Sequence, residues 1–157
     1  MDVPRSPGEL ALAEARRHLG YREEPPGSNR THFGSWFGLD GVPWCAIFVS
    51  YCFEVGAGVV LGGGRSFVRG VASVPQLRTW LGDTGRWVGP GPAQPGDLVL
   101  FDWDGGVPDH VGLVEHVTGP SRFVTIEGNT GIGHDADGGE VMRRTRSGRG
   151  VVGFGRV

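Results

Sequence analysis

Residues 45–55 are almost all apolar or small. A helix of this composition has no polar face to present to solvent, so other elements must surround it. Gly56 and Gly58 follow the segment and can end such a helix. The chain is therefore predicted to fold around one buried central helix.

Two more helices are predicted on either side of this segment. Ser6 and Glu9 have the spacing of a capping box, which predicts a helix that continues to about Leu19. Ser73 as the cap and Pro75 in the first turn predict a shorter helix after the central one. Residues 21–41 between the first two helices, including the aromatic run 33–37, are interpreted as a long loop.

The second half of the chain has a different pattern. Short runs rich in valine and isoleucine alternate with Gly, Pro, Asp and Ser, as is typical of a meandering antiparallel sheet. The runs are 98–103, 110–117, 123–127, 141–146 and 151–157. Helices followed by strands predict an α+β fold with N-terminal helices packed on a C-terminal antiparallel sheet. With 157 residues, a single domain over 1–157 is expected.

Composition excludes several classes of protein. The 15 basic and 17 acidic residues nearly balance, so no nucleic-acid partner held by bulk charge is expected. The 30 glycines and 11 prolines are spread between apolar runs, which indicates a turn-rich folded domain. We expect neither a membrane span nor a signal peptide, so a protein acting outside the cytoplasm would need release or delivery by another system. The sequence gives no indication of oligomeric state.

Cys45 is the candidate nucleophile. It begins the central helix, where unpaired backbone N–H groups and the helix dipole favour a thiolate. Trp44 beside it offers an apolar wall. Cys52 lies seven residues further along the same helix, roughly 10 Å away, which is too far for a disulfide. Cys52 is interpreted as a small buried hydrophobe.

His110 is the candidate base. It begins an apolar strand, and a strand is the rigid support that a base needs if it is to stay within about 3 Å of a sulfur. His116 on the same strand is the alternative. His18, His32 and His134 lie in polar contexts and are less favoured.

Glu127 and Asn129 end another strand-like run and would lie on one face if the strand continued that far. Either side chain could accept a hydrogen bond from the imidazole nitrogen that does not face the sulfur. Glu127 would also stabilise an imidazolium, so we assign it the orienting role and Asn129 a supporting one.

Metal chemistry is the other enzymatic alternative. The acidic residues of 102–109 have a faint likeness to a calcium loop but lack its bidentate glutamate, so we interpret this segment as a turn. A zinc hydrolase could use His110, His116, His134 and Asp109, but the chain has no His-Glu-x-x-His helix. No metal and no cofactor are predicted.

Four segments together resemble the successive signatures of the CHAP family, the cysteine, histidine-dependent amidohydrolases/peptidases. These are Gly-Val-Pro-Trp-Cys-Ala-Ile-Phe-Val-Ser-Tyr-Cys at 41–52, Gln-Pro-Gly-Asp-Leu-Val-Leu-Phe at 94–101, Asp-His-Val-Gly-Leu-Val-Glu at 109–115 and Ile-Glu-Gly-Asn-Thr at 126–130. The resemblance extends from about Tyr21 to the C-terminus, with residues 1–20 forming an additional N-terminal helix.

The resemblance implies a papain-like α+β fold and hydrolysis of amide bonds in bacterial peptidoglycan, by a phage lysin, a wall-remodelling enzyme or an antibacterial effector. It implies that Cys45, His110, Glu127 and Asn129 form the site. An amidase and an endopeptidase both fit, and a catalytically silent wall-binding or adaptor domain is the non-enzymatic alternative.

Substrate contacts are expected from a smaller set of residues. Trp36, Trp44 and Trp103 are candidates to line a groove, because aromatic faces give a large contact area at little entropic cost. Trp44 is the one expected to lie near the nucleophile. The backbone N–H of Cys45 is the expected first oxyanion donor, and Asn29 is a candidate for the second.

Overall fold

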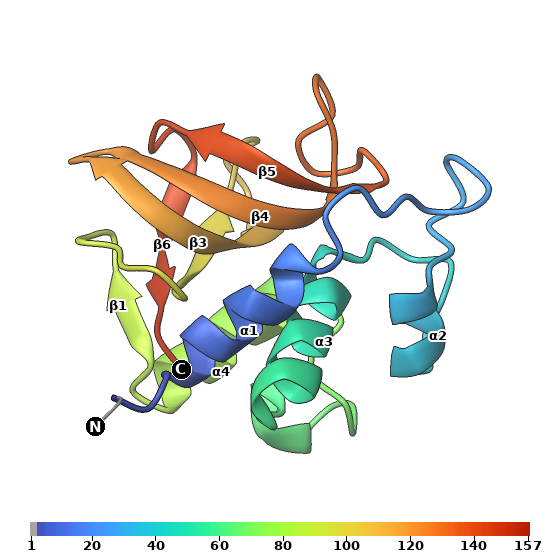
Figure 1. The fold of residues 1–157 in the computed structure, drawn as a ribbon, viewed down its shortest axis with the longest axis horizontal. Helices are drawn as coiled ribbons and strands as arrows, with labels where there is room; N and C mark the ends of the chain where they lie inside the picture. The colour runs from blue at the N-terminus through green and yellow to red at the C-terminus, as the bar shows by residue number, and fades with distance from the viewer. Residues whose placement is uncertain (1–2) are drawn as a thin grey trace.

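The computed structural model describes residues 3–157, so Met1 and Asp2 of the predicted domain lie outside the described residues. These described residues form four α-helices, a short 3₁₀ helix and six strands (Figure 1). The helices are α1 Pro7–Arg16, α2 His32–Phe37, α3 Cys45–Ala57, η1 Leu61–Gly64 and α4 Val74–Asp83. The strands are β1 Trp87–Gly89, β2 Leu98–Phe101, β3 His110–Gly119, β4 Arg122–Thr130, β5 Glu140–Arg146 and β6 Val151–Gly155. Helices packed on an antiparallel sheet confirm the predicted α+β fold.

All strand pairs in the sheet are antiparallel, in the order β1-β6-β2-β3-β4-β5. Strands β2 to β5 form the predicted meander. The prediction is wrong for the last strand, because β6 crosses back to pair with β2 instead of continuing beside β5. Strand β1, which was not predicted, pairs with β6 at the sheet edge.

The central helix is buried as predicted over most of its length, but its last turn is not, and Val55 is 48% exposed. Eight residues of α3 are buried, and α1 packs along it on one face of the sheet (Figure 1). Strands β3 and β4 turn alternate side chains toward these helices, among them Leu113 and Ile126. The opposite face of the sheet has its own smaller cluster, which includes Phe101 and Phe123. The two faces therefore have distinct cores.

Two helices differ from the prediction. Helix α1 ends at Arg16, and the chain then turns before Tyr21. The aromatic run predicted as loop is helix α2. Its cap is Thr31, whose hydroxyl accepts the N–H of Gly34. Within residues 3–157 no helix has both the length and the apolar character needed to cross a bilayer.

Candidate active site

Cys45 is the first residue of α3 and lies at the end of the helix where N–H groups lack intrahelical partners. The residue before it, Trp44, gives no side-chain cap to the helix. Cys45 is only 5% exposed. Its sulfur therefore sits beside uncapped N–H donors in a nearly dry environment, where the helix dipole favours negative charge.

Hydrogen bonds to a buried glutamate hold the turn before Cys45 in place. The indole of Trp44 is fully buried, and its Nε1–H donates to Oε1 of Glu23 over 3.2 Å. The other oxygen of Glu23 accepts the backbone N–H of Asn29 over 2.9 Å. A buried carboxylate thus ties the 21–30 loop to the residue that precedes the nucleophile candidate.

His110 is the first residue of β3, paired with Phe101 of β2. Its Nε2 lies 2.8 Å from Oε1 of Glu127, and both side chains are completely buried. An ionised carboxylate only accepts hydrogen bonds, so Nε2 carries the proton and donates. Among residues 3–157 Nδ1 has no hydrogen-bond partner, and it is the ring nitrogen left for the Cys45 thiol.

The charges of the site support one another. Burial alone lowers the pKa of His110, but the interactions with Cys45 and Glu127 outweigh it and raise the pKa to about 9. Burial alone raises the pKa of Glu127, but its contacts with Arg146 and His110 bring the pKa down to about 2. At neutral pH the structure therefore holds an imidazolium against a carboxylate.

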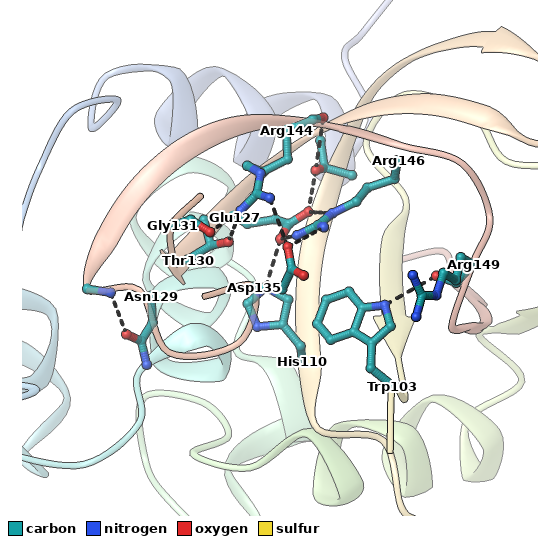
Figure 2. Close-up of polar contacts among 12 residues, drawn as sticks. Trp103, His110, Glu127, Asn129, Thr130, Gly131, Asp135, Arg144, Arg146 and Arg149 are labelled. Carbon is teal, nitrogen blue, oxygen red and sulfur yellow. Dashed lines mark hydrogen bonds and ion pairs between the residues drawn. The ribbon is translucent and has the colours of Figure 1, made fainter. Parts of the chain in front are cut away.

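Glu127 has two more partners, on β4 and β5 (Figure 2). The hydroxyl of Thr125 donates to its Oε2. Arg146 donates to both of its oxygens, from Nε to Oε2 over 2.9 Å and from Nη2 to Oε1 over 2.6 Å. Both oxygens of this buried carboxylate thus accept hydrogen bonds.

The side chains of Thr125, Glu127 and Arg146 lie on the sheet face opposite α3. The neighbouring Gly128 faces the helix, since a Cβ there would meet the side chain of Phe48 at 2.7 Å. Gly112, opposite Glu127, leaves the room that the glutamate occupies. Alternation along β4 therefore determines which face receives the carboxylate.

Asn129 does not join Glu127 as expected. Its φ of 56° is left-handed, which interrupts the alternation of the strand. Its Oδ1 accepts the N–H of Gly139 over 3.0 Å, and Figure 2 shows it apart from His110. Its Nδ2 is buried and has no hydrogen-bond partner in the described part of the chain. A catalytic role for Asn129 stays a prediction.

The residues expected to bind substrate have different positions. Trp44 is adjacent to Cys45 but fully buried, so its indole cannot present a face to a ligand, which corrects that expectation. Trp103 is partly exposed, with its ring centroid 5.5 Å from that of His110. Trp36 packs on Tyr51 at a centroid separation of 5.1 Å. The backbone N–H of Asn29 donates to Glu23, and the buried Oδ1 of Asn29 has no hydrogen-bond partner among the residues that the structure describes.

A pocket of about 340 Å³ opens beside Cys45. Pro43 and Cys45 form one wall, and Pro108 and Asp109, just before His110, form another. The start of α4 closes it at Ser73. The lining is mainly apolar, so the pocket suits an uncharged part of a substrate next to the sulfur.

The histidines considered for zinc are not brought together. His116 and His134 are exposed, whereas His110 is buried. Within residues 3–157 the one group of three potential ligands is Asp102, Asp104 and Asp109, whose carboxylate oxygens lie within 4.8 Å of one another. These could hold a cation, but Oδ1 of Asp102 already accepts three backbone N–H groups, as in a turn.

Thr125, Asp135 and Arg146 were not predicted as site residues. Arg144 and Arg146 alternate along β5, and this pattern is typical of a solvent-facing strand edge. The register that sets Arg146 near Glu127 depends on the β4–β5 pairing. That pairing cannot be deduced from local sequence.

Comparison with known proteins is consistent with this geometry. The sequence profile of the CHAP domain matches residues 37–129, more than half of the chain. No similar sequence is found among curated proteins.

Two solved structures resemble the whole described fold. They are the crystal structure of Ly7917 and that of Ly7917 with the hydrolyzing product of MDP. Each has a TM-score of 0.59 and 23% identity, and they cover 97% and 95% of this chain. This chain spans 62% of the length of each. The likeness is one of fold, and the predicted papain-like α+β architecture is confirmed.

Proposed function

Because this chain belongs to the CHAP domain family, we propose that it hydrolyses amide bonds in bacterial peptidoglycan. Cys45 is the nucleophile, His110 its proton acceptor and Glu127 the residue that orients His110. The observation that carries the proposal is the buried contact of His110 with Glu127, which leaves Nδ1 for a thiol at a helix N-terminus.

The first half of the reaction follows from these positions. His110 takes the proton of Cys45 before the substrate reacts, which forms the imidazolium present at neutral pH, and the sulfur then attacks the amide carbonyl as a thiolate. The carbonyl oxygen becomes an oxyanion, which the backbone N–H of Cys45 can stabilise. The imidazolium then gives its proton to the departing amine as the C–N bond breaks. An acyl-enzyme remains on the sulfur.

Water completes the cycle. His110 removes a proton from water, the resulting hydroxide attacks the thioester, and the C–S bond breaks to release the carboxylic acid and the thiolate. Glu127 holds the ring through both halves and stabilises the imidazolium with its negative charge. Its own ionisation is maintained by Arg146, because the pair is buried together.

The substrate assignment has two supports. The CHAP domain match covers the segment that carries Cys45, His110 and Glu127. A solved neighbour of the same fold, Ly7917, contains the hydrolyzing product of MDP. The aromatic face of Trp103 beside His110 offers a surface for a glycan or peptide.

The test compares two cysteines of the same helix. Cys45→Ala and Cys45→Ser are expected to lower release of soluble fragments from purified walls by about 1,000-fold or more. Cys52→Ala is the matched control, because Cys52 is fully buried and burial raises its pKa well above the usual range. It should retain wild-type rates.

Two outcomes would contradict the proposal. Lysis retained by folded Cys45→Ala would remove the nucleophile assignment. Wild-type protein that binds walls of several chemotypes but releases nothing would be a wall-binding domain. Mass spectrometry of released fragments assigns the bond, since an amidase frees the sugar lactyl group and an endopeptidase exposes new amino termini within the peptides.

A further inference from the structure

Arg146 shares an oxygen with the histidine of the site. Oε1 of Glu127 accepts the Nη2–H of Arg146 over 2.6 Å and the Nε2–H of His110 over 2.8 Å. The second contact, from Nε to Oε2, makes the arginine grip two-pronged. With both oxygens held, the carboxylate cannot rotate without breaking a buried ion pair.

The guanidinium is itself held from other sides (Figure 2). Nη1 donates to Oδ1 of Asp135 in the β4–β5 loop over 2.8 Å. Its Cζ lies 5.0 Å from the ring centroid of Trp103, within cation–π range. Trp103 in turn lies against the ring of His110. The Arg146 side chain is only 10% exposed. The Arg146 side chain is therefore held by more contacts than the side chains of a typical surface ion pair.

We propose that Arg146 is a positioning residue of this site: its two-pronged contact fixes the Glu127 carboxylate, and through it the His110 ring, so that Nδ1 is presented to the Cys45 thiol. The proposal rests on the function proposed above for Cys45 and His110. A lysine offers a point charge instead of a planar fork, so it would keep the charge but not the orientation.

The charged groups around the carboxylate define the expected pH behaviour. Two cations contact Glu127: His110 on β3 and Arg146 on β5. Two further carboxylates lie next to these cations, Asp135 beside Arg146 and Asp109 beside His110. Without Arg146, the buried carboxylate loses its main cation and takes up a proton at higher pH. Protonated Glu127 no longer supports the imidazolium, so the acid limb of Cys45 reactivity should move upward.

The test measures Cys45 alkylation by iodoacetamide, mapped by mass spectrometry, between pH 4 and 9, together with kcat and KM on solubilised wall fragments. Arg146→Gln is expected to lower the alkylation rate at pH 7 and kcat by about 10- to 100-fold. Its acid limb should move to higher pH, with KM little changed. Arg146→Lys should restore the position of the limb but only part of the rate.

Arg143→Gln is the control, because Arg143 lies on the same strand and pairs with a different carboxylate, Glu115. It should leave both readouts unchanged, whereas an equal loss in this variant would overturn the proposal. The proposal would also be overturned if folded Arg146→Gln kept the wild-type alkylation rate and the wild-type acid limb. If Arg146→Gln does not fold, wild-type rates in Arg146→Lys have the same meaning.

Alkylation needs no peptidoglycan, so the two proposals can fail separately. A wild-type protein that alkylates as expected but cleaves no wall would contradict the proposed function and leave the role of Arg146 intact.

Discussion

Nε2 of His110 donates a hydrogen bond to Oε1 of Glu127 over 2.8 Å, and neither side chain is exposed to solvent. The contact fixes the orientation of the ring, since the Nε2–H points at the carboxylate and Nδ1 is left to face the sulfur. It also separates the histidine from water, so its charge state depends on its neighbours. The pH dependence of the protein should report this pair.

Wall lysis is expected to fall as the pH rises through about 9, the pKa to which Cys45 and Glu127 raise His110 against the effect of its burial. Below that pH the imidazolium is available to protonate the leaving amine, and above it the proton is lost. Glu127→Gln removes a negative charge, so its alkaline limb should move to lower pH. Initial rates of fragment release between pH 5 and 10.5 measure the alkaline limb of the wild type and of Glu127→Gln. A limb that stays in place in Glu127→Gln would contradict the assignment.

The same pair should make folding stability depend on pH. His110 has a raised pKa, so its contribution is fully present below its ordinary value of 6.5 and is lost as the pH rises through about 9. Glu127 has a lowered pKa, so its contribution is present above 4.5 and is lost as the pH falls through about 2. Both are complete between pH 4.5 and 6.5.

Urea unfolding of wild type and Glu127→Gln tests this window. We expect Glu127→Gln to lose about 3 kcal/mol near pH 5.5, because it leaves Arg146 without its buried partner. The difference should shrink at pH 10, where only the arginine contact remains. An equal difference at both pH values would show that His110 does not take part.

Chelation should not inactivate the protein, because the proposed chemistry uses only Cys45, His110 and Glu127. We expect unchanged lysis after treatment with EDTA and complete loss after iodoacetamide. Calcium titration by calorimetry tests the Asp102 turn separately, and no binding tighter than about millimolar is expected. Loss of lysis on chelation that zinc restores would favour the metal alternative.

The parts of the site that the sequence predicts are those encoded locally. Cys45 is recognisable from the apolar run that it begins, and His110 and Glu127 from strand-like runs that they begin or end. The long, uniform helix α3 was predicted for the same reason. Each of these inferences uses residues within a few positions of one another.

The parts that escaped prediction depend on distant pairing or on a single backbone angle. The return of β6 to β2 joins segments about fifty residues apart in the chain. Arg146 is largely shielded from solvent only because β5 pairs with β4 in one register. The left-handed φ of Asn129 redirects its side chain. Helix α2 is six residues long, too short for its periodicity to show.

Trp44 and Glu23 should stabilise the fold through the hydrogen bond that joins their side chains. Trp44→Phe removes the N–H that Glu23 accepts, and we expect a loss of about 1–3 kcal/mol because a buried carboxylate oxygen loses its donor. Glu23→Gln should also destabilise the protein. The double variant should cost less than the sum of the two, as for residues in direct contact. Urea unfolding measures the cycle, and strict additivity would show that the bond contributes nothing.

Gly112 should be essential for activity because of the space it leaves. A Cβ at this position would lie 2.6 Å from Cγ of Glu127, so Gly112→Ala must displace the carboxylate that orients His110. We expect fragment release to fall about 100-fold, with a loss of stability of about 1–3 kcal/mol.

Gly119→Ala is the matched control on the same strand. There the nearest atom to the added Cβ is Cβ of Arg122 at 3.7 Å, an ordinary contact. This variant should cleave walls at the wild-type rate. Equal losses in the two variants would mean that β3 as a whole tolerates no side chain at either glycine. A selective loss in Gly112→Ala would instead connect activity to the position of Glu127, because the two substitutions add the same methyl group to the same strand.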